Sequence, residues 1–176
     1  MKSLIFFLLL AQPVLADSFT KEAPKVADSL KKNLMGNLQK EIKENGTIKA
    51  IDFCHSEVTD LGTKTSKEFK DKYQFGRTSH KIRNPKNAPQ EWVIPYLEKF
   101  QTKKQGDEGA SPFFHTTKQD NRIYLEPLWV APMCLQCHGE NISKNVDNEI
   151  LKRYPKDKAR AFKVGDFRGF IWVKEK

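Results

Sequence analysis

The chain has 176 residues, enough for one ordinary domain with a hydrophobic core, and carries 31 Lys and Arg against 22 Asp and Glu, for a formal net charge of +9. Its 38% hydrophobic and 30% charged residues exclude a multi-span membrane protein, a collagen-like chain and a wholly disordered one. Three cysteines are too few for a disulfide-dense scaffold. Because three thiols cannot all pair with one another, at least one needs another explanation.

Residues 1–16 have the pattern of a secretory signal peptide. Lys2 precedes an apolar run from Leu4 to Leu10, and Val14 and Ala16 supply small side chains at a cleavage point. The run is shorter than the ~20 residues of a spanning helix, so we expect cleavage and no membrane anchor. We therefore expect residues 17–176 to form a single domain in the bacterial periplasm or an equivalent oxidising space.

The lysines alternate with acidic residues along the predicted helices, which is typical of a solvated surface, and export removes the usual nucleic-acid partners. We expect no nucleic-acid binding. A basic surface suits an acidic partner protein or an anionic lipid.

Hydrophobic periodicity predicts two N-terminal helices. Residues 17–24 are expected to be a frayed terminus. From Pro24 to Asn45 one helix face carries an apolar residue at every fourth position, and Gly46 ends the helix. A second helix is predicted from Thr47 to Tyr73, with one face formed by Ile51, Cys54, Val58, Leu61, Thr65 and Phe69. This pattern puts Cys54 on the buried face and His55 near its edge.

The sequence after residue 73 predicts both helices and strands. Two prolines and Gly76 predict irregular backbone over residues 74–90, followed by a helix from Glu91 to Lys103 and a loop at 106–111. Alternating patterns predict a hairpin of residues 113–117 and 122–130, then a polar helical stretch at about 141–163 and a terminal strand at 167–173. Helices followed by antiparallel strands predict an α+β fold.

The motif Cys134-Leu135-Gln136-Cys137-His138 is the attachment signal for c-type haem. Two thiols at this spacing can each add to one haem vinyl group, and the adjoining histidine is then carried under the ring to bind iron. One motif predicts one covalent haem c. A zinc site needs about four compactly grouped ligands, and a thioredoxin-like dithiol needs a βαβ unit, so both are disfavoured, as is a simple disulfide.

The ligand on the other side of the iron is less clearly indicated. Met1 leaves with the signal peptide, Met133 adjoins the motif and cannot reach the opposite face of the ring, and Met35 is interpreted as helix-edge packing. The remaining candidates are Cys54, His55, His80 and His115. Cys54 is either an inert buried thiol or a thiolate held on ferric iron.

Several further motifs resemble a family of cyanobacterial c-type haem proteins with a PAS-like fold, which also occurs as periplasmic haem sensor domains. The resemblance covers about residues 25–174. It rests on Cys54, Gly76-Arg77-Thr78-Ser79, Arg83-Asn84-Pro85, Asn87-Ala88-Pro89, Glu126-Pro127-Leu128, the haem motif with Gly139, and Gly165-Asp166-Phe167-Arg168-Gly169.

The resemblance implies iron held by Cys54 and His138. It also implies that residues 77–89 wrap the haem, which makes Arg77, Arg83, Asn84 and Pro85 predicted cofactor-binding residues. Arg77 and Arg83 would suit the propionates, because a guanidinium pairs bidentately with a carboxylate. The family usually has Ala-Pro after its ligand cysteine; here His55 follows, so His55 is a competing ligand.

Three functions follow from these features. We expect a periplasmic haem sensor of redox state or of a gas such as NO or CO, which passes its signal to a separate partner protein. The alternative is an electron-transfer cytochrome that docks on an acidic redox partner. A peroxidase-like enzyme would need an open iron site with a distal acid–base residue, and we expect no enzymatic activity.

Overall fold

The computed structural model describes residues 17–56, 69 and 71–176. A long N-terminal helix, α1 (Ser18–Ser56), precedes an antiparallel sheet of four strands in the order β1-β4-β3-β2. The strands are β1 (Tyr73–Thr78), β2 (Phe113–Thr116), β3 (Arg122–Trp129) and β4 (Phe167–Glu175), and the shorter helices are α3 (Ile94–Phe100), α4 (Leu135–His138) and α5 (Lys144–Arg153). The predicted α+β class is confirmed. The predicted signal peptide lies outside the described residues.

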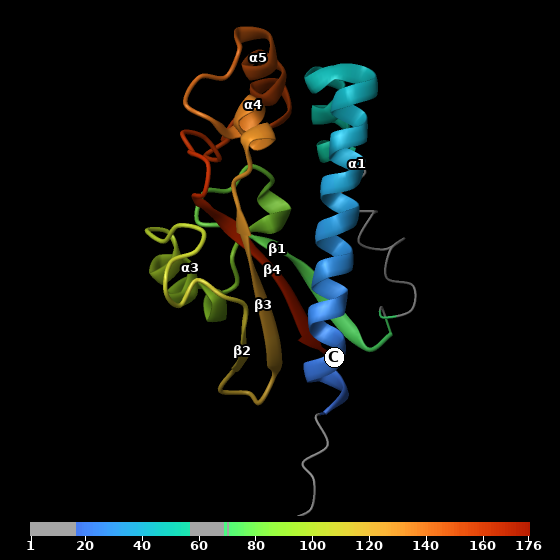
Figure 1. Ribbon diagram of the computed structural model, residues 1–176, viewed down its shortest axis with the longest axis vertical. Coiled ribbons are helices and arrows are strands. Elements are labelled where there is room, and N and C mark those ends of the chain that lie inside the picture. The colour runs from blue at the N-terminus through green and yellow to red at the C-terminus, as the bar shows by residue number, and fades with distance from the viewer. Residues whose placement is uncertain (1–16, 57–68, 70) are drawn as a thin grey trace, which may run out of the picture.

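The sheet lies between α1 and α3 (Figure 1). Successive side chains of a strand point to opposite faces, and β4 follows this rule from Phe170 to Val173. Ile171 and Val173 pack with Phe19 and Val26 of α1, whereas Phe170 packs on the α3 side. The core therefore has two parts: Phe19, Ala23, Val26, Ala27, Tyr73, Tyr124, Ile171 and Val173 on one face, and Val93, Leu97, Phe100, Ile123, Leu125, Phe167 and Phe170 on the other.

Helix α1 starts earlier than predicted and bends where predicted. We expected residues 17–24 to fray, but α1 begins at Ser18 because Phe19 and Ala23 are fully buried against the sheet. Gly46 has φ 81°, which breaks the helical geometry and divides α1 into segments 18–45 and 47–56. None of the described helices is long and apolar enough to cross a bilayer.

Strand β1 corrects two predictions. The second helix was expected to continue to Tyr73 and residues 74–90 to be irregular, yet Tyr73–Thr78 pairs along its whole length with β4. Gly76 is opposite Trp172, and a Cβ at residue 76 would lie 2.7 Å from the indole ring. The glycine therefore lets the Trp172 side chain lie over the strand. Residues 57–68 of the predicted helix lie outside the described residues.

The C-terminal half follows the predicted order with shorter helices. The hairpin forms as expected from β2 and β3. Helix α3 ends at Phe100 rather than Lys103, and α5 ends at Arg153, where Tyr154 and Pro155 interrupt it; residues 154–166 are turns and irregular backbone. β3 leads into α4, and α4 and α5 lie beside the upper part of α1 (Figure 1). The Cys134-x-x-Cys137-His138 motif and Cys54 thereby come to line one cavity.

Gly169 provides a test of the sheet. Its φ is 149°, and a Cβ would lie 2.2 Å from the carbonyl oxygen of Thr78. We expect Gly169→Ala to lower the free energy of unfolding by about 2–4 kcal/mol, from backbone strain and overpacking. Gly36→Ala is the control: it lies in a helix with nothing within 4 Å of its Cβ, so it should stabilise by about 0.5–1 kcal/mol. Urea unfolding followed by circular dichroism measures both, and equal midpoints for the two variants would contradict this account.

Candidate functional site

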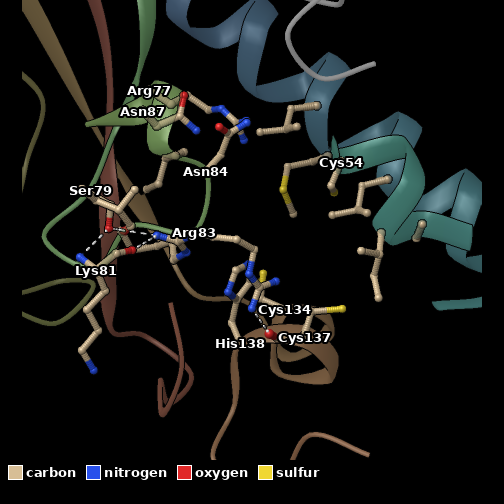
Figure 2. Close-up of a pocket in the computed structure, with 18 of the residues that line it drawn as sticks. Cys54, Arg77, Ser79, Lys81, Arg83, Asn84, Asn87, Cys134, Cys137 and His138 are labelled. Atoms are coloured by element: carbon tan, nitrogen blue, oxygen red, sulfur yellow. Dashed lines mark hydrogen bonds between the residues drawn. The ribbon is translucent and has the colours of Figure 1, made fainter. Parts of the chain in front are cut away.

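A cavity of about 190 Å³ lies between the upper part of α1, the segment after β1 and the motif on α4 (Figure 2). Its walls come from elements far apart in the sequence. They comprise Leu34, Met35, Leu38, Ile42, Ala50, Ile51 and Cys54 of α1; Arg77, Thr78, Ser79, Lys81, Ile82, Arg83, Asn84 and Asn87; and Leu128, Trp129, Met133, Cys134, Cys137, His138, Tyr154 and Arg168.

The structure brings the predicted site residues together at this cavity, with one exception. Cys54 lies on α1, and Cys134, Cys137 and His138 lie across the cavity from it (Figure 2). Arg77, Arg83 and Asn84 line the same space. Pro85 is not a lining residue; it begins a short 3-10 turn, Pro85–Asn87, which Asn84 caps by accepting a hydrogen bond from the Lys86 N–H at 3.0 Å.

One wall of the cavity is an apolar helix face that the described residues only partly cover. Val26 and Leu30 of the predicted helix face pack on the sheet, but Leu34, Leu38 and Ile42 on the same face are only half-buried and border the cavity. Apolar walls with a few polar groups are the usual lining of a site for a small organic ligand. The arrangement suits a largely apolar molecule lying against α1.

The other side of the cavity is positively charged. Arg77, Lys81, Arg83 and Arg168 line it, and none of the described lining residues is acidic. Burial, together with the nearby charges of Arg83 and Arg77, lowers the pKa of Arg168 to about 10. Arg168 Nη1 donates to the Ser79 hydroxyl at 2.9 Å, so the guanidinium is fixed in place. A ligand that brings negative charge would relieve the repulsion among these cations.

Arg77 and Arg83 differ in the partners they already have. Arg83 donates from Nε and Nη2 to the two carboxylate oxygens of Asp157, each at 3.0 Å. Arg77 makes no hydrogen bond or ion pair with any residue that the structure describes, and burial lowers its pKa. Of the two predicted propionate partners, Arg77 is the one free to bind an external carboxylate.

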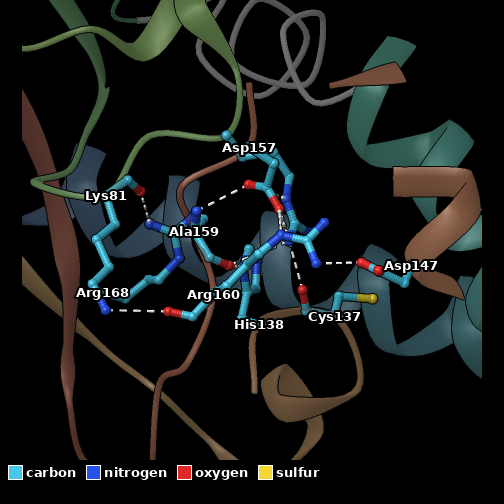
Figure 3. A network of polar contacts seen from close by, with 9 residues as sticks. Lys81, Cys137, His138, Asp147, Asp157, Ala159, Arg160 and Arg168 are labelled. Atoms are coloured by element: carbon cyan, nitrogen blue, oxygen red, sulfur yellow. Dashed lines mark hydrogen bonds and ion pairs between the residues drawn. The ribbon is translucent and has the colours of Figure 1, made fainter. Parts of the chain in front are cut away.

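The fully buried carboxylate of Asp157 organises the motif (Figure 3). Besides Arg83, it accepts from the Ala159 N–H at 2.9 Å and pairs with Arg160 Nε at 2.9 Å. Arg83 Nη2 also donates to the Cys137 carbonyl at 2.5 Å. Asp157 therefore ties the segment after β1 to the motif through Arg83, and fixes Ala159 beside it.

Ala159 in turn orients the imidazole of His138. The Nδ1 atom lies 2.8 Å from the Ala159 carbonyl and donates its proton to it, which leaves Nε2 with a lone pair. Burial lowers the pKa of His138 well below its usual value, and the charges of Arg168 and Arg83 act in the same direction. A neutral histidine held by Nδ1 is the usual form of a metal-ligating imidazole.

All three cysteines are free thiols. Burial raises the pKa of Cys54, against the opposing charges of Arg77, Arg83 and Arg168, and raises that of Cys137 to about 11. Both thiols are therefore protonated at neutral pH unless a metal or a covalent bond takes the proton. Among the described residues no group of three or more His, Cys, Asp and Glu could hold a metal ion, so a zinc site finds no support there.

The other candidate iron ligands differ in whether they line the cavity. His115 on β2 is hydrogen-bonded to the Tyr96 hydroxyl at 2.7 Å, and His80 stacks on Phe167; neither lines the cavity. The side chain of His55 lies outside the described part of the structure, so its competition with Cys54 stays a prediction. Met35 does line the cavity.

Ser79 and Arg168 lie in motifs named in the sequence analysis, where neither was given a specific role, and Asp157 was missed. Asp157 had no sequence signal, because its partners are brought to it only by the fold.

Comparisons with known proteins agree with this architecture. The family model described as Tll0287-like (Tll0287) matches residues 15–175. The crystal structure of the cyanobacterial heme-protein Tll0287 is similar with a TM-score of 0.64 and 23% sequence identity, over 88% of this chain and 92% of that one. No curated protein sequence matches. Because the family model spans nearly the whole chain, the protein belongs to the Tll0287-like family.

Proposed function

We propose that this protein carries one haem c, attached through Cys134 and Cys137, with its iron held between His138 and Cys54, and that it acts in the periplasm as a redox or gas sensor. The observation that carries the proposal is a single cavity with Cys54 on one wall and the Cys-x-x-Cys-His motif across from it. The similar solved structure is that of a heme-protein, which supports the same reading. The resemblance of the sequence to a family with a PAS-like fold supports the sensor role by analogy of fold only.

The residues present fit a haem on three counts. The apolar face of α1 suits a flat porphyrin, the cationic side suits two propionates, and the fixed imidazole of His138 suits iron. When bound, the haem would supply one-electron chemistry and an iron that binds small gases. Cys54 would donate an anionic sulfur, which favours ferric iron and a low reduction potential.

The arginines take separate roles in this proposal. Arg77, which has no acidic partner among the described residues, holds a propionate together with Arg168. Arg83 acts on the motif instead, since its guanidinium is occupied by Asp157 and the Cys137 carbonyl. This revises the expectation that Arg83 binds a propionate.

We propose no catalytic role. Apart from His138, no histidine or carboxylate is found among the described lining residues, so a distal acid–base group of the kind a peroxidase needs has no candidate there. The signal or electron would pass to a separate protein, and the net positive charge suits an acidic partner. Electron transfer is the alternative function, and it is favoured if the haem keeps its ligands and binds no NO or CO.

The first test is the ferric electron paramagnetic resonance spectrum of the haem-loaded protein. We expect a low-spin signal with a narrow spread of g values and a thiolate charge-transfer band in the optical spectrum. Cys54→Ala should lose both features, while keeping the covalent haem. Cys134→Ala is the control, because it should keep the thiolate features and lose one thioether bond, visible by mass spectrometry after denaturation. A spectrum that Cys54→Ala leaves unchanged would refute the thiolate assignment.

The second test concerns charge. Arg77→Leu removes a cation beside the haem and should lower the reduction potential by tens of millivolts, since tenfold in a one-electron equilibrium corresponds to about 59 mV. Arg77→Lys keeps the charge and should shift the reduction potential less. Arg122→Leu, at the distant end of β3 where Arg122 pairs with Glu175, should leave the potential unchanged. Redox titration followed optically measures all three, and equal shifts in Arg77→Leu and Arg122→Leu would contradict the role of Arg77.

The third test concerns the buried ion pair. Asp157→Asn leaves Arg83 and Arg160 without their shared carboxylate, and we expect it to cost about 3–5 kcal/mol of stability and to reduce haem incorporation. Asp147→Asn removes only the partly exposed partner of Arg160 and should cost about 1 kcal/mol or less. Thermal unfolding and the haem-to-protein ratio after purification report both effects; equal behaviour of the two variants would count against Asp157 as the organising residue.

A further inference from the structure

Met35 lines the same cavity as Cys54, although neither the sequence analysis nor the proposed ligation uses it. We propose that Met35 is a second iron ligand, and that it binds the iron when reduction releases Cys54. This inference rests on the proposed haem. The site would then hold two interchangeable sulfur ligands, one for each oxidation state. Such an exchange would give a sensor its two states.

The side of the haem follows from the walls of the cavity. Cys54 and Met35 both belong to α1, whereas His138 belongs to α4 on the facing wall (Figure 2). Met133, the other lining methionine, directly precedes Cys134 and lies on the His138 side by chain connectivity. Of the two methionines, Met35 is therefore the one that shares a wall with Cys54.

The chemistry of the two sulfurs favours different oxidation states. A thiolate is anionic and stabilises ferric iron, whereas a thioether is a neutral, soft donor that stabilises ferrous iron and raises the potential. If the haem is bound, a one-electron donor protein would reduce the iron and the bond between iron and Cys54 would break. The Cys54 sulfur would keep the electron pair and take a proton from water, and a lone pair of Met35 Sδ would form the new bond.

Met35 and Cys54 lie in different segments of α1. Met35 belongs to segment 18–45, whose lower part packs on the sheet, and Cys54 belongs to segment 47–56 beyond the non-helical Gly46. Segment 47–56 is itself held in place, because Ile51 packs with Val146 and Ile150 of α5 and Asp52 pairs with Arg153. Release of Cys54 would therefore be a rotation of its side chain rather than a movement of the whole segment.

The experiment compares the ferric and ferrous haem-loaded protein with Met35→Leu, and with Met133→Leu as the matched control. Ferrous wild type should be six-coordinate and low-spin by optical and resonance Raman spectroscopy. Ferrous Met35→Leu should be five-coordinate and high-spin, while its ferric thiolate spectrum stays as in the wild type, which also shows that the variant is folded. Met133→Leu should match the wild type in both states.

Carbon monoxide titration gives a second readout. In the ferrous wild type, CO can bind only to the fraction of molecules in which Met35 is off the iron. If that fraction is a tenth or less, Met35→Leu should bind CO at least about tenfold more tightly than the wild type. A ferrous Met35→Leu that remains low-spin, or a wild type that is already high-spin when reduced, would overturn the role of Met35. If Cys54 does not bind the iron at all, the result is different: Cys54→Ala would then leave the ferric spectrum unchanged.

Discussion

Helix α1 is longer than the sheet it packs on, and the site depends on that difference. Its first segment, residues 18–45, spans roughly 42 Å at about 1.5 Å per residue, whereas the longest strand, β4, spans roughly 30 Å at about 3.3 Å per residue. Phe19, Ala23 and Val26 cover the sheet, and the apolar face then continues beyond it. A helix face that is apolar along its length, and that the described part of the chain covers only in its first half, leaves a wall for a ligand.

The other side of the cavity carries positive charges whose mutual repulsion is unfavourable unless a ligand brings negative charge. Arg77 and Arg168 are brought into one half-apolar space with no lining carboxylate among the described residues to neutralise them. Asp157 balances only Arg83 and Arg160, and in doing so it fixes Ala159 and, through its carbonyl, His138. The network therefore separates two tasks: Asp157 positions the motif, and the guanidinium of Arg77, which has no acidic partner among the described residues, is left for an anion.

Features carried by local pattern could be predicted from the sequence. The hairpin, the break at Gly46 and the helical position of Cys54 all follow from spacing within a few residues. Features set by distant contacts could not. Residues 73–78 became a strand because β4 pairs with them and Trp172 needs Gly76, and residues 18–24 became helix because Phe19 meets the sheet. Arg83 was assigned to a propionate because its partner Asp157 is far along the chain.

The central claim is that Cys54 and His138 hold one iron from opposite walls of this cavity. X-ray absorption at the iron edge of the ferric, haem-loaded protein tests it most directly, because it identifies the elements bonded to the metal. The account predicts one sulfur neighbour together with the nitrogens of the porphyrin and of His138, and loss of that sulfur in Cys54→Ala. A shell that contains only nitrogen neighbours would contradict the claim and would favour His55 as the ligand.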